Sequence, residues 1–260
     1  MLEGKTVVVS GGTYGIGRGI VLDLARRGWN VVAFGLDSRQ PGSAAEGGVK
    51  GTRQALAEAG HSGEVLEGDC SNSADVERAM AHAVSTYGRL DAAVNNAAIR
   101  PTGTILETEE ETFDRVIAVN LKGQFLVCKA AITHMKEMGG GAIVNIGSGA
   151  GWGKEGLLAY GASKGGVFAL SSALAYDHLV DRIRINVVVP GPQTASGMVE
   201  IMADKGPLPK VATASGRTNQ PRDIANAVAF LLSDEAGQIS GTVLDVGAFS
   251  HQGGVGQPRA

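Results

Sequence analysis

The feature of this sequence that most restricts its fold is a β-branched run that passes directly into glycines and then into a helix. Residues 5–10 are rich in β-branched side chains, as in a strand that is covered on both faces. A glycine-rich stretch at 11–17 follows, and apolar residues then recur at helical spacing over 20–25. Because neighbouring parallel strands need such a crossover, this unit predicts a parallel sheet with helices on its faces.

The same alternation of short strands and helices continues along the chain. Further strands are expected at residues 30–34, 64–69, 90–94, 141–146, 182–189 and 242–246. Helices are expected at 53–59, from Ser73 onward, at 108–138 with an interruption near 120–123, from Tyr160 to His178, and at 222–233. The pattern predicts one doubly wound α/β domain over residues 1–260, in three layers, with ligands at the carboxyl ends of the strands.

The composition excludes several function classes. Charged residues make up 19% of the chain and the formal net charge is −3, so no basic surface for nucleic acid is expected. Cys70 and Cys128 form no metal-type or redox-type pair, and the histidines have no metal-ligand spacing, so no metal site is predicted. Since the sequence shows neither a leader nor an 18-residue apolar run, a soluble, cytoplasmic protein without a membrane partner is expected.

The glycine-rich stretch reads Gly11-Gly-Thr13-Tyr14-Gly15-Ile16-Gly17. Glycines allow the backbone to turn tightly and to approach a pyrophosphate, whose negative charge the N-terminus of the next helix favours. A glycine turn alone is equally typical of a structural loop, and this spacing differs from Gly-x-Gly-x-x-Gly. Its position between the first strand and the first helix favours dinucleotide binding.

The next strand ends carry residues suited to an adenosine. Asp37 lies twenty residues after Gly17, where a carboxylate would accept hydrogen bonds from a ribose and repel a 2′-phosphate. Arg39 could instead reach such a phosphate from the loop. Asp69, followed by Cys70, could contact the adenine amino group, and a turn role for Asp69 is nearly as well supported.

The fourth strand ends in Asn95-Asn96-Ala97-Ala98. Small residues and amides at this place suit close packing beside an adenosine, and Asn96 and Ala97 are therefore candidate cofactor residues. They would equally suit packing at the end of a sheet.

A candidate proton-transfer set lies in the second half of the chain. Tyr160 and Lys164 are four residues apart, so on a helix they share one face, and a nearby ammonium favours the phenolate. Ser148 follows the strand at 141–146, where its hydroxyl could hold a carbonyl or alcohol oxygen. Tyr-x-x-x-Lys alone is also typical of an ordinary helix surface, so the surrounding motifs decide between the two interpretations.

Asn120 stands at the interruption of the long helix. An Asn and a Gly inside a helix lower its stability relative to better helix formers. The interruption therefore predicts either a group that holds a water molecule or a plain kink.

Taken together, these residues resemble the short-chain dehydrogenase/reductase family over nearly the whole chain, from Gly4 to about Gly247. The resemblance is carried by the following set: the Gly11–Gly17 turn, Asp69, Asn95-Asn96-Ala97-Ala98, Asn120, Ser148, Tyr160-x-x-x-Lys164 and Pro190-Gly191.

The resemblance implies a seven-stranded Rossmann-type sheet, a nicotinamide cofactor and commonly a homotetramer or homodimer. By this similarity Tyr160 is the general acid/base, and Lys164 lowers its pKa and holds the nicotinamide ribose. Ser148 orients the substrate oxygen, and Asn120 places a water that links Lys164 to solvent.

Three departures from the family pattern concern the cofactor. Ala98 stands where the family has Gly, and Thr194 lies one position early for the Thr that bonds the nicotinamide carboxamide. The usual ribose-binding Asp falls on Gly35, two residues before Asp37. Tyr14 and Leu36 occupy the places where NADP-dependent members usually carry Lys or Arg, so NAD is predicted and NADP is not excluded.

The resulting prediction is reversible hydride transfer between NAD(H) and a small-molecule secondary alcohol or ketone. The alternatives are an NADP-dependent 3-oxoacyl thioester reductase and a non-catalytic dinucleotide-binding subunit. Residues 190–220 are expected to form a mobile lid, whose Lys205, Lys210 and Arg217 would suit an acyl-carrier protein. An apolar substrate pocket could be lined by Trp152, Leu157, Leu158, Met198 and Met202. The same residues would equally suit packing in the core or between subunits.

Overall fold

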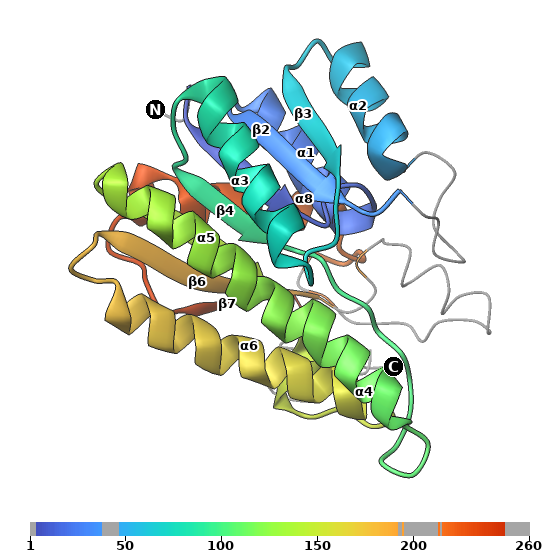
Figure 1. The fold of residues 1–260 in the computed structure, drawn as a ribbon. Coiled ribbons are helices and arrows are strands. Elements are labelled where there is room, and N and C mark those ends of the chain that lie inside the picture. Colours follow the sequence, from blue (N-terminus) through green and yellow to red (C-terminus); the bar gives the residue numbers. More distant parts are fainter. Residues whose placement is uncertain (1–3, 38–46, 192–193, 195–212, 214, 248–260) are drawn as a thin grey trace.

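The computed structural model describes residues 4–37, 47–191, 194, 213 and 215–247, and contains one seven-stranded sheet (Figure 1). Its strands are β1 (Thr6–Ser10), β2 (Asn30–Gly35), β3 (Gly63–Glu67), β4 (Ala92–Asn95), β5 (Gly141–Ile146), β6 (Ile183–Pro190) and β7 (Val243–Val246). They run in the order β3-β2-β1-β4-β5-β6-β7, and every neighbouring pair is parallel. The predicted doubly wound, three-layer fold is confirmed.

Helices cover both faces of this sheet (Figure 1). They are α1 (Gly15–Arg26), α2 (Gly48–Glu58), α3 (Ser73–Tyr87), α4 (Glu110–Ile117), α5 (Gly123–Glu137), α6 (Leu158–Asp177) and α8 (Pro221–Leu232). Short turns of 3₁₀ helix lie at η2 (Gly149–Trp152) and η3 (Asp234–Ala236). Helix α2 begins five residues before the predicted helix at 53–59. The helices predicted from Ser73, at 108–138, from Tyr160 and at 222–233 begin within two residues of their predicted positions.

Alternate side chains of each central strand enter two separate cores. On β1, Val7 and Val9 pack with residues of α1, α2 and α8, while Val8 packs on the other face with residues of α3 and α5. Every side chain of β1 is buried, and the strand consists of three valines flanked by Thr6 and Ser10. Because both faces of the strand are covered, neither face needs charged side chains.

The long helix predicted at 108–138 consists of α4 and α5 joined by a π-helical turn, η1 (Ala118–Lys122). By length and composition, the stretch Glu110–Glu137 could cross a membrane, since an 18-residue window within it has a mean hydropathy of 1.3. However, 56% of that window is buried inside the protein, where α5 packs against the sheet. Its apolar character is therefore accounted for by core packing.

The carboxyl ends of β1, β4, β5 and β6 lie at one edge of the sheet, since all strands are parallel. Ser10 is paired with Asn95, and Asn95 with Asn145, so the segments that follow these strands are neighbours. This edge brings the glycine turn, the Asn96 segment and Ser148 together. The predicted lid at 190–220 lies mostly outside the described residues.

Candidate active site

Tyr160 and Lys164 lie one turn apart on α6 and are both buried, at 7% and 1% exposure. The Lys164 Nζ donates to the carbonyl of Ile146 at the end of β5, at 2.7 Å, and lies 5.8 Å from the centre of the Tyr160 ring. The predicted common face of the helix is therefore present. An ordinary surface pair would be exposed to solvent, and these two side chains are not.

Burial dominates the titration of both groups. It raises the pKa of Tyr160, while the hydrogen bond with Ser148 and the positive charge of Arg100 act in the opposite direction. Burial lowers the pKa of Lys164 to about 8. Lys164 is not among the groups that lower the Tyr160 pKa here, so its expected effect on the phenol stays a prediction.

Ser148 lies between β5 and η2, in extended backbone. Its hydroxyl accepts a hydrogen bond from the amide of Ala150 at 3.2 Å, which caps the short helix. The Ser148 side chain also acts to lower the pKa of Tyr160. Ser148 thus lies close enough to the phenol to influence it, as a shared substrate oxygen would require.

Asn120 lies in the π-helical turn and is fully buried. Its amide oxygen accepts from the backbone N–H of Ile99 at 2.8 Å, and its amide nitrogen donates to the Ile99 carbonyl at 2.9 Å. That nitrogen also lies 3.1 Å from Ser163 Oγ, which in turn donates to the Tyr160 carbonyl at 2.7 Å. Asn120 therefore ties the segment after β4 to the helix that carries Tyr160; a water bound by Asn120 stays a prediction.

The glycine turn is packed closely against the segment after β4. Gly11 has φ +64°, and a Cβ at this residue would lie 2.6 Å from backbone atoms of Ala97. A Cβ at Gly17 would lie 2.0 Å from the Gly11 carbonyl oxygen, to which Asn96 Nδ2 donates at 2.8 Å. Side chains larger than glycine are excluded at both places, as the phosphate interpretation of the turn requires.

The N-terminus of α1 has the properties of an anion site. Helix α1 is twelve residues long and begins at Gly15, with Ile16 and Gly17 in its first turn. No side chain caps it, and its first turn holds no acidic residue. The first amides of α1 and their partial positive charge are thus left for a bound group such as a pyrophosphate. These residues fit a dinucleotide.

The residues after β2 differ from the family pattern for a physical reason. A Cβ at Gly35 would lie 2.6 Å from Thr13 Oγ1, so Thr13 as placed excludes the usual Asp there. Asp37 Oδ1 instead accepts from the amide of Val49 at the start of α2, at 2.8 Å, and Tyr14 Oη donates to the Asp37 carbonyl at 3.2 Å. Asp37 has a helix-capping contact in this structure, and its contact with a ribose stays a prediction.

Asp69 and Cys70 have structural contacts as well. Asp69 accepts from the amide and the hydroxyl of Ser71, at 2.9 and 2.7 Å, and pairs with Arg115 at 3.2 Å; these contacts lower its pKa against the effect of burial. The Cys70 thiol is buried against Gly123, and burial raises its pKa to about 12. Both cysteines are free. Cys70 is therefore a protonated packing residue, and any contact with a cofactor stays a prediction.

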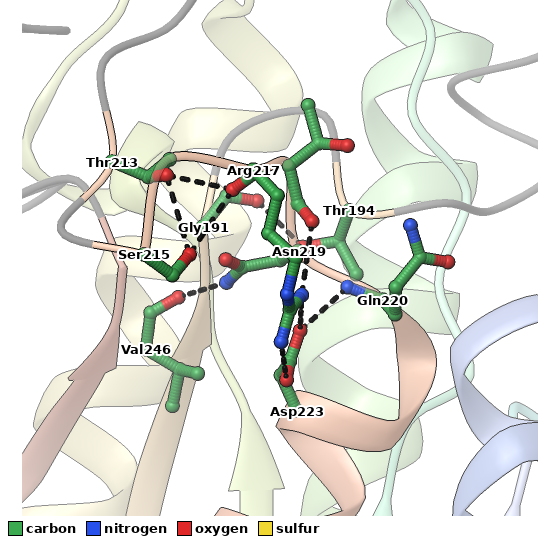
Figure 2. Close-up of polar contacts among 10 residues, drawn as sticks. Gly191, Thr194, Thr213, Ser215, Arg217, Asn219, Gln220, Asp223 and Val246 are labelled. Atoms are coloured by element: carbon green, nitrogen blue, oxygen red, sulfur yellow. Dashed lines mark hydrogen bonds and ion pairs between the residues drawn. The ribbon is translucent and has the colours of Figure 1, made fainter.

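The segment that leads into α8 is held by an exposed ion pair (Figure 2). Arg217 donates to both carboxylate oxygens of Asp223, at 2.7 and 2.8 Å, and Asp223 also accepts from the amide of Gln220 at 2.8 Å. Arg217 is therefore paired within the chain, contrary to its expected availability for an acyl-carrier protein. Lys205 and Lys210 lie outside the described residues, as do Arg39, Met198 and Met202.

Thr194 is fixed beside Pro190 and Gly191 at the end of β6 (Figure 2). Its hydroxyl donates to the Gly191 carbonyl at 2.7 Å, and its side chain is buried. Asn219 donates to the carbonyl of Val246 and so joins this segment to the end of β7. Thr194 is thus placed at the expected edge of the sheet, with its hydroxyl already engaged with the backbone.

The apolar residues predicted around the substrate divide into two groups. Leu157 is buried against Ala150 and Tyr160, so it belongs to the core under the site. Trp152 is 41% exposed and packs on Phe168 with 4.5 Å between ring centres, and Leu158 is 37% exposed. Among the described residues of this set, Trp152 and Leu158 are therefore the exposed ones.

Arg100 is a residue that the sequence analysis did not select. Its guanidinium carbon lies 5.9 Å from the centre of the Tyr160 ring, and its charge lowers the pKa of that phenol. No local pattern marks it, because its contact with Tyr160 joins residues 60 positions apart in the chain. The residues that the structure describes contain no group of three or more candidate metal ligands.

The comparisons with known proteins agree with this geometry. Residues 11–248 match the family model described as enoyl-(acyl carrier protein) reductase. An uncharacterized oxidoreductase of Thermotoga maritima is 36% identical and covers 94% of this chain and 96% of its own. A 2-(S)-hydroxypropyl-CoM dehydrogenase of Xanthobacter autotrophicus is 34% identical over 98% of this chain and 97% of its own.

A solved structure extends the same result. The 3-ketoacyl-(acyl-carrier-protein) reductase of Brucella melitensis, complexed with NADH, has a TM-score of 0.80 and 31% identity, covering 95% of this chain and 98% of its own. The chain belongs to the short-chain dehydrogenase/reductase family. It is an NAD(P)-dependent oxidoreductase of the kind that acts on CH–OH groups.

Proposed function

We propose that the protein interconverts a small secondary alcohol and its ketone with NAD(H), using Tyr160 as the general acid/base. The observation that carries this proposal is the cluster of the half-buried Ser148 with the buried Tyr160 phenol and Lys164 ammonium, at the sheet edge next to the glycine turn. A substrate oxygen held by Ser148 would lie within reach of the phenol.

Each residue has a separate task in the proposed reaction. In oxidation, Tyr160 as phenolate takes the hydroxyl proton while Ser148 holds the oxygen; in reduction, Tyr160 returns the proton. Lys164, fixed by the Ile146 carbonyl, provides positive charge near the phenol and is available to a ribose hydroxyl. When bound, the nicotinamide supplies or accepts the hydride. Its pyrophosphate would be held by the first turn of α1, with Thr13, Tyr14, Asn96, Ala97 and Thr194 along the cofactor.

NAD is the proposed cofactor. Asp37 carries the carboxylate nearest the end of β2, and a carboxylate there repels a 2′-phosphate. The structural relative from Brucella melitensis is complexed with NADH. The test is kcat/KM with each cofactor: NAD should be favoured at least tenfold, about 1.4 kcal/mol, and a tenfold preference for NADP would overturn this part.

The alternative substrate class is a 3-oxoacyl thioester, as the name of the Brucella melitensis relative suggests. A carrier-protein substrate needs basic residues beside the site, and Arg217 is engaged by Asp223. A purely non-catalytic role would leave the Ser148–Tyr160–Lys164 cluster without a purpose. A panel of free alcohols and ketones, 3-oxoacyl thioesters and enoyl thioesters, followed by nicotinamide absorbance, separates these functions.

The proposed setting is a cytoplasmic homo-oligomer, a homotetramer or a homodimer, with no nucleic-acid or membrane partner. The outward face of α6 carries the small residues Ala162, Ala169 and Ala173, which permit another helix to approach closely. Phe125 on α5 is 45% exposed, so it adds an aromatic side chain of the type that interfaces favour.

A further inference from the structure

We propose that Arg100 is the substrate's anion-binding residue, so that the natural substrate is a secondary alcohol or ketone bearing an oxyanion near the reacting carbon. The inference deepens the proposed function and depends on it for the identity of the reacting oxygen. It begins from the position of the guanidinium, 5.9 Å from the centre of the Tyr160 ring.

The backbone that carries Arg100 is fixed on both sides. Before it, both backbone groups of Ile99 are hydrogen-bonded to Asn120. After it, Gly103 donates to the Gly156 carbonyl at 2.9 Å, and the Leu158 amide donates to the Gly103 carbonyl at 3.2 Å. The segment is thus tied to the turn that leads into α6, which carries Tyr160. Arg100 is held at the wall of the site.

The charge of Arg100 is unmatched among the described residues. It is partly buried, yet it forms no ion pair with a described carboxylate and no hydrogen bond to a described carbonyl. By contrast Arg115, near the cofactor side, pairs with Asp69, and Arg217 pairs with Asp223. A partly desolvated guanidinium gains most from a charged acceptor, and its planar fork suits carboxylate, sulfonate and phosphate groups.

The short distance between the two groups limits the substrate. The substrate oxygen must reach the phenol of Tyr160, while the anion must come within about 2.7–2.9 Å of the guanidinium nitrogens. Both contacts are possible together only if the anion is a few bonds from the reacting carbon. A compact oxo acid or hydroxy acid meets this condition, whereas a neutral alcohol leaves the guanidinium unpaired.

The test compares matched acids and esters as substrates for reduction. Acetoacetate is measured against methyl acetoacetate, and acetonylphosphonate against its dimethyl ester, with wild type, Arg100→Met, Arg100→Lys and Arg26→Met. Arg26 lies on α1, is largely exposed and bonds Asp23, so Arg26→Met removes the same single positive charge away from the site.

The wild type should prefer an acid over its ester in kcat/KM by roughly 10- to 100-fold, the range for one charge-assisted hydrogen-bonded contact. Arg100→Met should abolish this preference, mainly by raising the KM of the acid. Arg100→Lys should retain part of it, and Arg26→Met all of it. The acid with the larger preference over its ester shows whether the natural substrate carries a carboxylate or a phosphonate-like group.

Three results would overturn the inference. They are equal use of acid and ester by the wild type, an equal loss for both in Arg100→Met, and an increase in the KM of the nicotinamide cofactor alone. In all three the ketones are still reduced, so the proposed function survives. If no ketone is reduced, the proposed function fails. The inference is then tested by calorimetry on the cofactor complex: the wild type should bind the acid more tightly than the ester, and Arg100→Met should bind both equally.

Discussion

At the scale of single residues, the chemistry depends on how a buried phenol is kept acidic enough to exchange a proton. Burial acts against this by raising the pKa of Tyr160, and two described neighbours oppose it: the Ser148 hydroxyl and the Arg100 charge. Lys164 is buried beside the ring with a lowered pKa of about 8, so it can lose part of its charge in mildly alkaline solution.

The Arg100 contribution gives a pH prediction. In alcohol oxidation Tyr160 acts as phenolate, so activity rises with pH through the pKa of Tyr160. Replacing Arg100 by Met removes a charge that lowers this pKa, and the rising limb of kcat/KM for a neutral alcohol should therefore move to higher pH. Arg100→Lys should restore it and Arg26→Met should not move it. If the rising limb does not move in Arg100→Met, the charge of Arg100 does not lower the pKa of Tyr160.

At the scale of elements, two connections hold the site in place: the π-helical turn of η1 and the segment that leads into α8. Asp223 at the start of α8 accepts from Arg217 and from the Gln220 amide, and its pKa is lowered to about 2, chiefly by Arg217. These contacts satisfy an amide at the helix N-terminus and fix the segment that leads into α8.

Asp223→Asn should lower the free energy of unfolding at neutral pH by about 0.5–1.5 kcal/mol, the range for a lost helix-terminal contact with an exposed ion pair. Because the pKa in the folded state lies below the unfolded value of about 3.9, the carboxylate stabilises the protein above pH ~4. That contribution is lost as the pH falls from about 4 toward the folded value near 2.

Urea unfolding at pH 7 and pH 3 measures this difference. The gap between wild type and Asp223→Asn should be smaller at pH 3, while Asp114→Asn, an exposed change in α4, should show little effect at either pH. A gap that is independent of pH would mean that the Asp223 carboxylate is not the stabilising group.

Most of the fold could be predicted from the sequence, because most strands carry a short apolar run bounded by a polar or glycine residue. The start of α2 could not, since Gly48 and its neighbours have no apolar periodicity, and this helix begins where Asp37 binds the Val49 amide. That contact joins residues twelve apart through a loop, which local propensity does not detect.

The site was predictable only in part, for a related reason. Tyr160 and Lys164 are four residues apart, so helical geometry alone places them together. Arg100 meets Tyr160 only because Asn120 and Gly103 fix a segment 60 residues upstream, a tertiary effect with no local pattern. Asn120 itself was selected for its helix-breaking character, and the structure adds which backbone groups it holds.

At the scale of the whole molecule, the exposed face of α6 predicts the assembly. Light scattering after size exclusion should give the mass of a dimer or a tetramer, since small residues on this face permit close packing between helices. Ala169→Arg should shift the protein toward smaller species, because it places a long charged side chain in a packed interface.

Ala81→Arg, on the exposed side of α3, is the matched control and should leave the mass unchanged. A monomeric wild type would contradict the predicted assembly. An assembly that Ala169→Arg does not disturb would show that the subunits do not meet through α6.

The central claim is that Tyr160 transfers the proton while other residues bind the cofactor, and replacing Tyr160 by Phe tests it most directly. The measurement is kcat for ketone reduction together with the dissociation constant of NADH, because Phe keeps the ring and removes only the hydroxyl. The account predicts that kcat falls by roughly 100-fold or more while NADH binding stays within about threefold of wild type. A Tyr160→Phe enzyme with activity within about tenfold of wild type would contradict it.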